Sequence, residues 1–407
     1  MDAQRLQGRD RALCAAITYG VMQNRMLLDH MIAACSAIEM KKIEPKVLDI
    51  LRIAAYQIML MDRIPTPAAV DSAVELCRET GHARATGFVN AVLRKLASSP
   101  PEIPTGWDAE ALSLRWSHPL WLTQMYIDLL GEEEAASLLE ADNASAPITL
   151  QTNTLRTDTE TLICSLTGEG LRCRKHPTVP DCVILDGGTF QRTHAYLQGE
   201  FYVQDPAAKM AVLVAAPRRG QRILDVCAAP GGKTFAAAIL SGGAEITACD
   251  IHENKLKRIG DGVKRMGLGE ITLQAADARR FLPEFEAAFD LVIADVPCSG
   301  LGVIRKKPDI RYKDPKEFAG LPEIQSGILQ NVSRYVKRGG TLLYSTCTIR
   351  PEENAGVVTE FLKEYMEFTF EDFVLPDGSV SKKGMLQLWP QRSGTDGFFI
   401  AKMRRWN

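Results

Sequence analysis

Two cysteines in this sequence directly follow strand-like segments. The apolar, β-branched run of residues 289–294 leads into Asp295-Val296-Pro297-Cys298. Proline has no N–H for a ladder hydrogen bond, so the strand should end here and present a carboxylate and a thiol. Cys347 follows the run 341–346 in the same way. Because ligands bind at the carboxyl ends of strands in open α/β sheets, this spacing predicts thiol chemistry on a substrate at that edge.

A glycine-rich turn, residues 228–234, lies between a predicted strand (223–227) and a predicted helix ending near Leu240. Backbone N–H groups and a helix N-terminus of this kind favour a nucleotide-like ligand. A phosphate-binding P-loop would need glycine where Cys227 stands, and the dinucleotide pattern Gly-x-Gly-x-x-Gly is absent. S-adenosylmethionine fits better, because Asp250 ends the next strand and offers an acceptor for ribose hydroxyls. Asp277, after a third strand, is expected at the adenine amino group.

A methyl donor beside a thiol suggests methylation of carbon 5 of a pyrimidine. That carbon is a poor nucleophile until a thiolate adds to carbon 6, and a base must later remove the carbon 5 proton so that the thiol can leave. A cation such as Lys233 would help the thiol to ionise. Asp295 is placed to hydrogen-bond the amino edge of cytosine. Enzymes that methylate an exocyclic amino group usually carry an aromatic ring where Cys298 stands, so carbon methylation is favoured.

The surrounding pattern predicts a multidomain protein. Residues 1–100 read as an all-α bundle, and residues 101–145 as a helical connector. Residues 146–205 read as a small α+β module. From 206 to 407, strands and helices alternate as in a doubly wound, Rossmann-like α/β domain.

Composition excludes several classes of protein. The 407-residue chain is 46% hydrophobic with a net charge of −2, so a polyanion partner requires a local basic surface. No signal peptide or membrane span is apparent, the ten cysteines form no Cys-x-x-Cys pair, and neither a metal nor an obligate protein partner is indicated. We therefore expect a cytoplasmic protein with reduced thiols. The candidates for phosphate contacts are Arg305, Lys306, Lys307, Arg311 and Lys313.

Several motifs resemble those of the RNA 5-methylcytosine methyltransferases. They are Asp225–Thr234, Gly199–Asp205, Asp295–Gly300, Ser345–Cys347 and Asp396–Phe399. Val296 departs from the alanine usual in the family but removes no reacting group. The first hundred residues resemble a NusB-type RNA-binding domain, and this fusion resembles the bacterial enzymes of the family that act on 16S ribosomal RNA.

The resemblance implies a role for each matching residue. Cys347 would be the nucleophile, Cys298 would assist product release, and Asp295 and Lys233 would support them. The cofactor site would be formed by Cys227, Ala228, Ala229, Pro230, Gly231, Gly232, Lys233, Asp250, Asp277 and Asp295. Three alternatives stay open: another RNA target, a DNA cytosine methyltransferase in which Cys298 attacks, and a NusB-like RNA-binding scaffold with little turnover.

Overall fold

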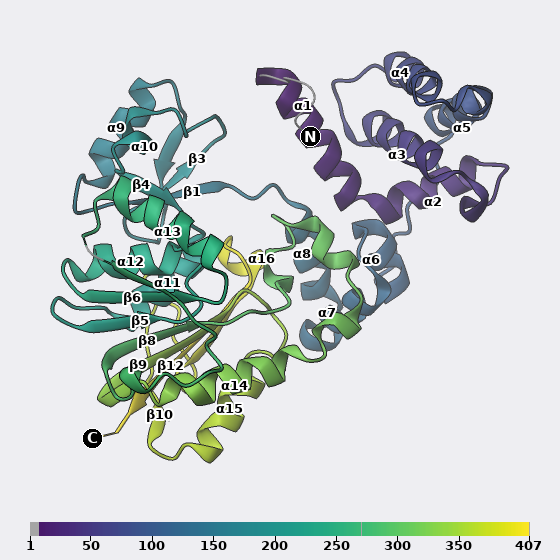
Figure 1. Cartoon of the computed structure of the whole chain (residues 1–407). Coiled ribbons are helices and arrows are strands. Elements are labelled where there is room, and N and C mark those ends of the chain that lie inside the picture. The colour runs from purple at the N-terminus through teal and green to yellow at the C-terminus, as the bar shows by residue number, and fades with distance from the viewer. Residues whose placement is uncertain (1–7, 270, 407) are drawn as a thin grey trace. The chain divides into compact units, whose positions relative to one another are not determined.

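The computed structural model describes residues 8–269 and 271–406, which fold into two compact units (Figure 1). Unit 1 is the described part of Met1–Ala144 together with Ile304–Lys313. Unit 2 is the described part of Ser145–Val303 and Asp314–Asn407. Residues 1–7 of the predicted helical bundle lie outside the described residues. The domain boundaries near 100, 145 and 205 stay a prediction.

Unit 1 is helical. A cluster of buried side chains that includes Leu28, Leu51 and Leu93 forms the core of its first part. These residues recur at helical spacing on amphipathic segments, which bury one face each. The helices are α1 (Gly8–Gln23), α2 (Arg25–Cys35), α3 (Pro45–Leu60), α4 (Thr66–Glu79), α5 (Thr86–Ser98), α6 (Ala109–Trp116), α7 (Leu120–Leu130) and α8 (Glu132–Asn143).

The segment Ile304–Lys313 packs into unit 1 although it is distant in sequence. Its 3-10 helix η5 (Pro308–Tyr312) contains Arg311, which is fully buried. The Arg311 guanidinium donates hydrogen bonds to Asn143 Oδ1 at 2.8 Å and to the Gln23 carbonyl at 3.1 Å. A buried charge needs such partners to offset its lost hydration. These contacts anchor the segment among the helices of unit 1.

Unit 2 begins with a four-stranded antiparallel sheet of order β2-β3-β1-β4. Its strands are β1 (Ile148–Thr152), β2 (Cys173–Lys175), β3 (Cys182–Leu185) and β4 (Phe201–Val203). Helices α9 (Thr159–Gly168) and α10 (His194–Leu197) accompany it. Leu150, Leu162 and Phe201 meet in a small core between sheet and helices. The predicted α+β module is therefore present.

The larger sheet of unit 2 has the order β10-β12-β9-β8-β5-β6-β7, with β11 paired to β12. The strands from β5 to β9 pair in parallel, whereas β12 is antiparallel to β9. The strands are β5 (Arg222–Asp225), β6 (Glu245–Asp250), β7 (Ile271–Ala275), β8 (Phe289–Asp295), β9 (Val336–Thr346), β10 (Phe368–Phe370), β11 (Met385–Leu388) and β12 (Phe398–Arg405).

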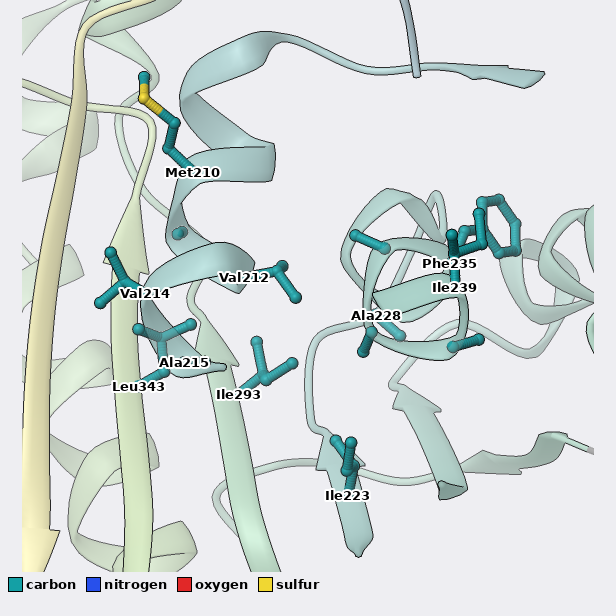
Figure 2. Close-up of a cluster of buried hydrophobic side chains, with 14 of the residues drawn as sticks. Met210, Val212, Val214, Ala215, Ile223, Ala228, Phe235, Ile239, Ile293 and Leu343 are labelled. Atoms are coloured by element: carbon teal, nitrogen blue, oxygen red, sulfur yellow. The ribbon is translucent and has the colours of Figure 1, made fainter. Parts of the chain in front are cut away.

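Two hydrophobic clusters cover the two faces of this sheet. Ile223, Ile293 and Leu343 belong to one, together with side chains of α11 and α12 (Figure 2). Their neighbours Leu224, Val292 and Leu342 belong to the other, because successive strand side chains point to opposite faces. The helices of this domain are α11 (Pro206–Ala215), α12 (Gly232–Ser241), α13 (Glu253–Met266), α14 (Leu321–Ser333), α15 (Ala355–Glu364) and α16 (Pro390–Ser393).

The strand order changes direction between β5 and β8. From β5 the chain adds β6 and β7 on one side, and it then crosses to β8 and β9 on the other. Such a switch point opens a crevice outside the carboxyl ends of the strands. Asp225 and Asp295, the last residues of β5 and β8, stand at this point. The predicted Rossmann-like architecture is confirmed.

Candidate active site

The glycine-rich turn after β5 is shaped by close backbone approach. Gly231 has φ of 108°, and a Cβ there would lie 2.7 Å from the Phe235 ring. Only glycine adopts this conformation without strain. The neighbouring Ala229 N–H donates to Asp250 Oδ2 at 3.2 Å, while the His252 N–H donates to Oδ1 at 2.9 Å. The turn and the end of β6 therefore hold the Asp250 carboxylate in place.

A cavity of about 470 Å³ opens beside this turn, within unit 2. This volume falls in the range of small-molecule sites. Of the predicted cofactor residues, five line it: Cys227, Ala229, Asp250, Asp277 and Asp295. Ala228, Pro230, Gly231, Gly232 and Lys233 do not line it. Gly232, for example, is backed by the Gln204 side chain, and a Cβ there would lie 2.8 Å from its amide nitrogen.

Other lining residues were missed in the sequence. Ile251 and His252 directly follow Asp250, and Ala278 and Arg279 directly follow Asp277. Their position after a strand-end acid is a signal that could have identified them. Ile324 and Ile328 come from α14 and face the cavity through tertiary packing that no local pattern reveals. Val226, Lys255, Ala276, Val296 and Pro297 complete this missed set.

Two of the strand-end acids differ sharply in environment. Arg279 forms a bidentate pair with Asp277, at 3.0 and 2.9 Å, and these hydrogen bonds lower the pKa of Asp277. Asp225 is instead fully buried, and this burial raises its pKa to about 7. Its Oδ2 accepts the Thr234 hydroxyl at 2.7 Å. Asp225 does not line the cavity, so it supports the turn rather than a ligand.

Lys233 and Asp295 form an ion pair at the carboxyl end of β8. The Lys233 Nζ lies 2.6 Å from Asp295 Oδ2, and the Ser345 hydroxyl donates to Oδ1 at 2.8 Å. The ammonium also lies 4.9 Å from the centre of the Phe398 ring. The hydrogen bond between Ser345 and Asp295 arises because the two residues pair in the parallel β8–β9 ladder. Lys233 thus orients the carboxylate that borders the cavity.

The thiols of Cys298 and Cys347 lie beside each other, with 3.3 Å between their sulfur atoms. Both residues line the cavity. The hydrogen bond from Cys298 lowers the pKa of Cys347, and the charge of Lys233 acts in the same direction. The same hydrogen bond, followed by burial, raises the pKa of Cys298 well above its usual value. This arrangement favours a Cys347 thiolate that accepts a hydrogen bond from the Cys298 thiol, and the thiolate is the nucleophilic form.

The predicted phosphate-contact residues all lie in the segment Ile304–Lys313 of unit 1. Lys307 and Lys313 are exposed, whereas Arg305 and Lys306 are half-buried. The prediction for Arg311 is wrong, because its side chain is fully buried and hydrogen-bonded within unit 1. A guanidinium enclosed in this way cannot reach a phosphate.

Among residues 8–269 and 271–406, no group of three or more His, Cys, Asp or Glu side chains is arranged to hold a metal ion. Within the same ranges, no helix has both the length and the apolar character required to cross a membrane.

Family models match three parts of the chain. The model of the 16S rRNA methyltransferase RsmB/F matches residues 212–404, and the NusB family model matches residues 1–98. A ferredoxin-like domain model of RsmF/B-like methyltransferases matches residues 118–190. The predicted NusB-type bundle and methyltransferase domain are therefore confirmed.

Two relatives that match almost the whole chain support the same family. "Probable ribosomal RNA small subunit methyltransferase B" of Bacillus subtilis is 35% identical over 98% of this chain and 92% of its own length. Ribosomal RNA small subunit methyltransferase B of Escherichia coli O7:K1 is 32% identical, with the same coverage of both chains.

Two solved structures are also similar. The crystal structure of PH0851 has a TM-score of 0.84 and 28% identity, over 99% of this chain and 92% of that one. A methyltransferase homolog protein from Pyrococcus horikoshii has a TM-score of 0.63 and 26% identity, over 73% and 98% of the two chains. With its fused NusB domain and its cavity at the sheet edge, this chain belongs to the 16S rRNA methyltransferase RsmB/F family.

Proposed function

We propose that this enzyme uses S-adenosylmethionine to methylate carbon 5 of one cytosine in 16S ribosomal RNA, the cytosine at position 967. The observation that carries the proposal is the pair of sulfur atoms 3.3 Å apart on the wall of the cavity. Methylation of an exocyclic nitrogen or a ribose oxygen has no use for two adjacent thiols, whereas addition to carbon 6 and later elimination use both.

The residues of the cavity fit S-adenosylmethionine. Asp250 accepts one backbone N–H on each oxygen, which leaves one lone pair on each for the two hydroxyls of a ribose. Ile251, Ile324 and Ile328 supply apolar surface for an adenine ring. Asp277, held by Arg279, presents a carboxylate that can accept a hydrogen bond from the amino group of the adenine. When bound, the cofactor supplies an electrophilic methyl group on a sulfonium.

The two thiols carry out the reaction steps on the cytosine base. Cys347 Sγ adds to carbon 6 of the cytosine, which makes carbon 5 nucleophilic enough to take the methyl group. Transfer of the carbon 5 proton to a water molecule then lets the carbon–sulfur bond break, and Cys347 leaves as a thiolate. Cys298, which keeps its proton at neutral pH because of that hydrogen bond and its burial, assists this release.

Asp295 and Lys233 act on the edge of the base. Each Asp295 oxygen already accepts one hydrogen bond, from Lys233 or from Ser345, and retains a lone pair for the cytosine amino group. The negative charge that develops on the ring as the adduct forms is stabilised by the positive charge of Lys233, which Asp295 holds in place. Lys233 also favours the ionised form of Cys347.

The remaining domains present the RNA. In this proposal residues 1–100 and 146–205 contact RNA, residues 101–145 connect them, and residues 206–407 catalyse. Exposed Lys307 and Lys313 contact phosphates, with Arg305 and Lys306 beside them in sequence. The target base must be unstacked to reach a thiol on the wall of the cavity, so a loop or incompletely assembled RNA is the expected substrate.

The proposal is tested by transfer of a labelled methyl group to unmodified 16S RNA, followed by mapping of the modified nucleotide. We expect 5-methylcytosine at position 967 alone, and 5-methylcytosine at another position would favour another RNA target. A label on an exocyclic nitrogen, or in 23S RNA alone, would contradict the proposal. Binding of 16S RNA without any transfer would favour the scaffold alternative.

A further inference from the structure

Glu353 is a fully buried carboxylate that the proposed chemistry does not use. It lies in the turn between β9 and α15 and does not line the cavity. Burial of a carboxylate is costly unless hydrogen bonds replace its lost hydration. The hydrogen bonds that Glu353 accepts therefore indicate what it stabilises.

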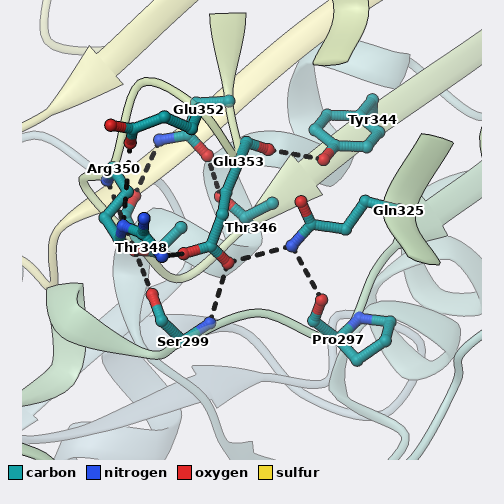
Figure 3. A network of polar contacts seen from close by, with 10 residues as sticks. Pro297, Ser299, Gln325, Tyr344, Thr346, Thr348, Arg350, Glu352 and Glu353 are labelled. Atoms are coloured by element: carbon teal, nitrogen blue, oxygen red, sulfur yellow. Dashed lines mark hydrogen bonds and ion pairs between the residues drawn. The ribbon is translucent and has the colours of Figure 1, made fainter. Parts of the chain in front are cut away.

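One oxygen of Glu353 holds the loop that carries Cys298 (Figure 3). The backbone N–H of Ser299 donates to Glu353 Oε2 at 2.9 Å. The Gln325 amide donates to the same oxygen at 2.9 Å and to the Pro297 carbonyl, also at 2.9 Å. Both residues that flank Cys298 are thus fixed, one directly and one through Gln325.

The same turn is fixed to the strand that carries Cys347. The Tyr344 hydroxyl donates to the Glu353 carbonyl at 2.6 Å. The Thr348 and Ser299 hydroxyls lie 2.7 Å apart, which joins the residue after Cys347 to the residue after Cys298. Glu353 and its neighbours therefore connect the two backbone segments from which the thiols project.

We propose that Glu353 is a positioning residue that holds Cys298 Sγ against Cys347 Sγ and so sets the rate at which methylated product is released. This inference rests on the proposed roles of the two thiols. The charge of Glu353 also contributes, after the Cys347 hydrogen bond and burial, to the raised pKa of Cys298. It therefore helps Cys298 to keep the proton with which it assists release.

Two substitutions of Glu353 separate the effect of its side-chain length from the effect of its charge. Glu353→Asp keeps the charge but withdraws the carboxylate by about 1.5 Å, one carbon–carbon bond, so Ser299 and Gln325 lose their acceptor. Glu353→Gln loses the charge and the acceptor of Arg350 Nη1, which lies 3.4 Å from Glu353 Oε1, but it retains an oxygen that can accept the hydrogen bonds of Ser299 and Gln325. Glu352→Gln is the matched control, because the neighbouring Glu352 side chain is 61% exposed and its ion pair with Arg350, at 3.6 Å, is longer than the 3.4 Å pair of Arg350 with Glu353.

The first readout is the covalent protein–RNA complex that resists denaturant, measured together with steady-state methyl transfer. We expect Glu353→Asp to accumulate the complex and to slow turnover by about 10- to 100-fold, as a misplacement of about 1 Å can do. Glu353→Gln should recover most of the turnover, and Glu352→Gln should match the unsubstituted enzyme. Equal loss in Glu353→Asp and Glu353→Gln without any trapped complex would overturn the inference.

The second readout needs neither RNA nor cofactor. A small reagent that bridges two adjacent thiols is added to the full-length enzyme, and the peptide joining Cys298 to Cys347 is quantified by mass spectrometry. We expect slower bridging in Glu353→Asp than in Glu353→Gln; equal rates in both and in the unsubstituted enzyme would overturn the inference. If the unsubstituted enzyme does not methylate 16S RNA, the proposed function fails. The bridging rates still test whether Glu353 holds Cys298 against Cys347.

Gln325→Met provides a second variant if Glu353→Asp does not fold. It removes the donor to Pro297 and to Glu353 while it keeps a side chain of similar volume. Trapped complex and slower bridging are again expected. Normal turnover and bridging in this variant would overturn the inference.

Discussion

The Lys233 ammonium lies 2.6 Å from Asp295 Oδ2, and Asp295 borders the cavity while Lys233 does not. We propose that this buried lysine acts through the carboxylate and through its charge. Its side chain is 8% exposed and that of Asp295 is 31% exposed, so solvent screens the pair only in part. We propose on this basis an electrostatic role for Lys233 rather than direct contact with the cofactor.

Replacement of Lys233 by methionine should weaken methyl transfer on the order of 100-fold, because a fixed charge beside the reacting base is lost. The pKa of Cys347 should rise, since Lys233 favours its thiolate. The pH dependence of Cys347 alkylation, followed by peptide mapping, measures this rise. Lys264→Met, which alters an exposed lysine of α13, is the control. An unchanged alkylation profile in Lys233→Met would refute this role.

Replacement of Asp250 by asparagine should weaken binding of S-adenosylmethionine by about 10- to 100-fold. The charged acceptor of two hydroxyl groups is lost, and hydrogen bonds to charged groups contribute about 1.5–3 kcal/mol. Calorimetric titration of the enzyme with the cofactor measures the change. Asp261→Asn, at an exposed position of α13, should bind normally. Equal affinity in both variants would remove Asp250 from the cofactor site.

Arg311→Met should destabilise unit 1 without altering cofactor affinity. The substitution leaves buried acceptors such as Asn143 Oδ1 and the Gln23 carbonyl without their donor. Loss of one partner from a buried charged network costs about 3–5 kcal/mol. Thermal unfolding measures the effect, and Lys313→Met in the same segment, an exposed position, is the comparison. Equal unfolding midpoints in the two variants would contradict the anchoring role of Arg311.

Acidification should destabilise unit 1 through His118. Burial, assisted by the charge of Arg311, lowers the pKa of this histidine to about 4. The unfolded chain, with a histidine pKa near 6.5, binds the proton more readily than the folded one between these values. Stability is therefore fully present above about pH 6.5 and falls by up to roughly 3 kcal/mol as the pH approaches 4.

The test is the free energy of unfolding by urea across this range. His118→Gln, which cannot titrate, should show a flatter slope than the unsubstituted chain. Parallel slopes in the two proteins would show that His118 is not the group responsible.

Strand-end residues could be predicted from sequence because each apolar run ends at a polar residue. Asp250, Asp277 and Asp295 were found in this way, and all three line the cavity. Proximity within the site could not be predicted. The 3.3 Å approach of Cys298 to Cys347 depends on β8 and β9 being neighbours in register, which only the sheet order defines.

Arg311 is a residue whose exposure was predicted wrongly from the sequence. A charged residue in a basic stretch is normally exposed, and sequence alone gave no reason to bury it. Its partners Gln23, Ser117 and Asn143 lie far from it in the chain and together supply the acceptors that make burial tolerable. Long-range acceptors of this kind have no local signature, so the error was unavoidable without the structure.

The central claim, that Cys347 forms the bond and Cys298 assists its release, is tested most directly with Cys298→Ala and unmodified 16S RNA. In the presence of S-adenosylmethionine, this variant should accumulate a covalent protein–RNA complex, seen as a band shift under denaturing conditions. The additional substitution Cys347→Ala should abolish both the complex and methyl transfer. A trapped complex in Cys347→Ala alone, with normal turnover in Cys298→Ala, would contradict the account and reverse the two roles.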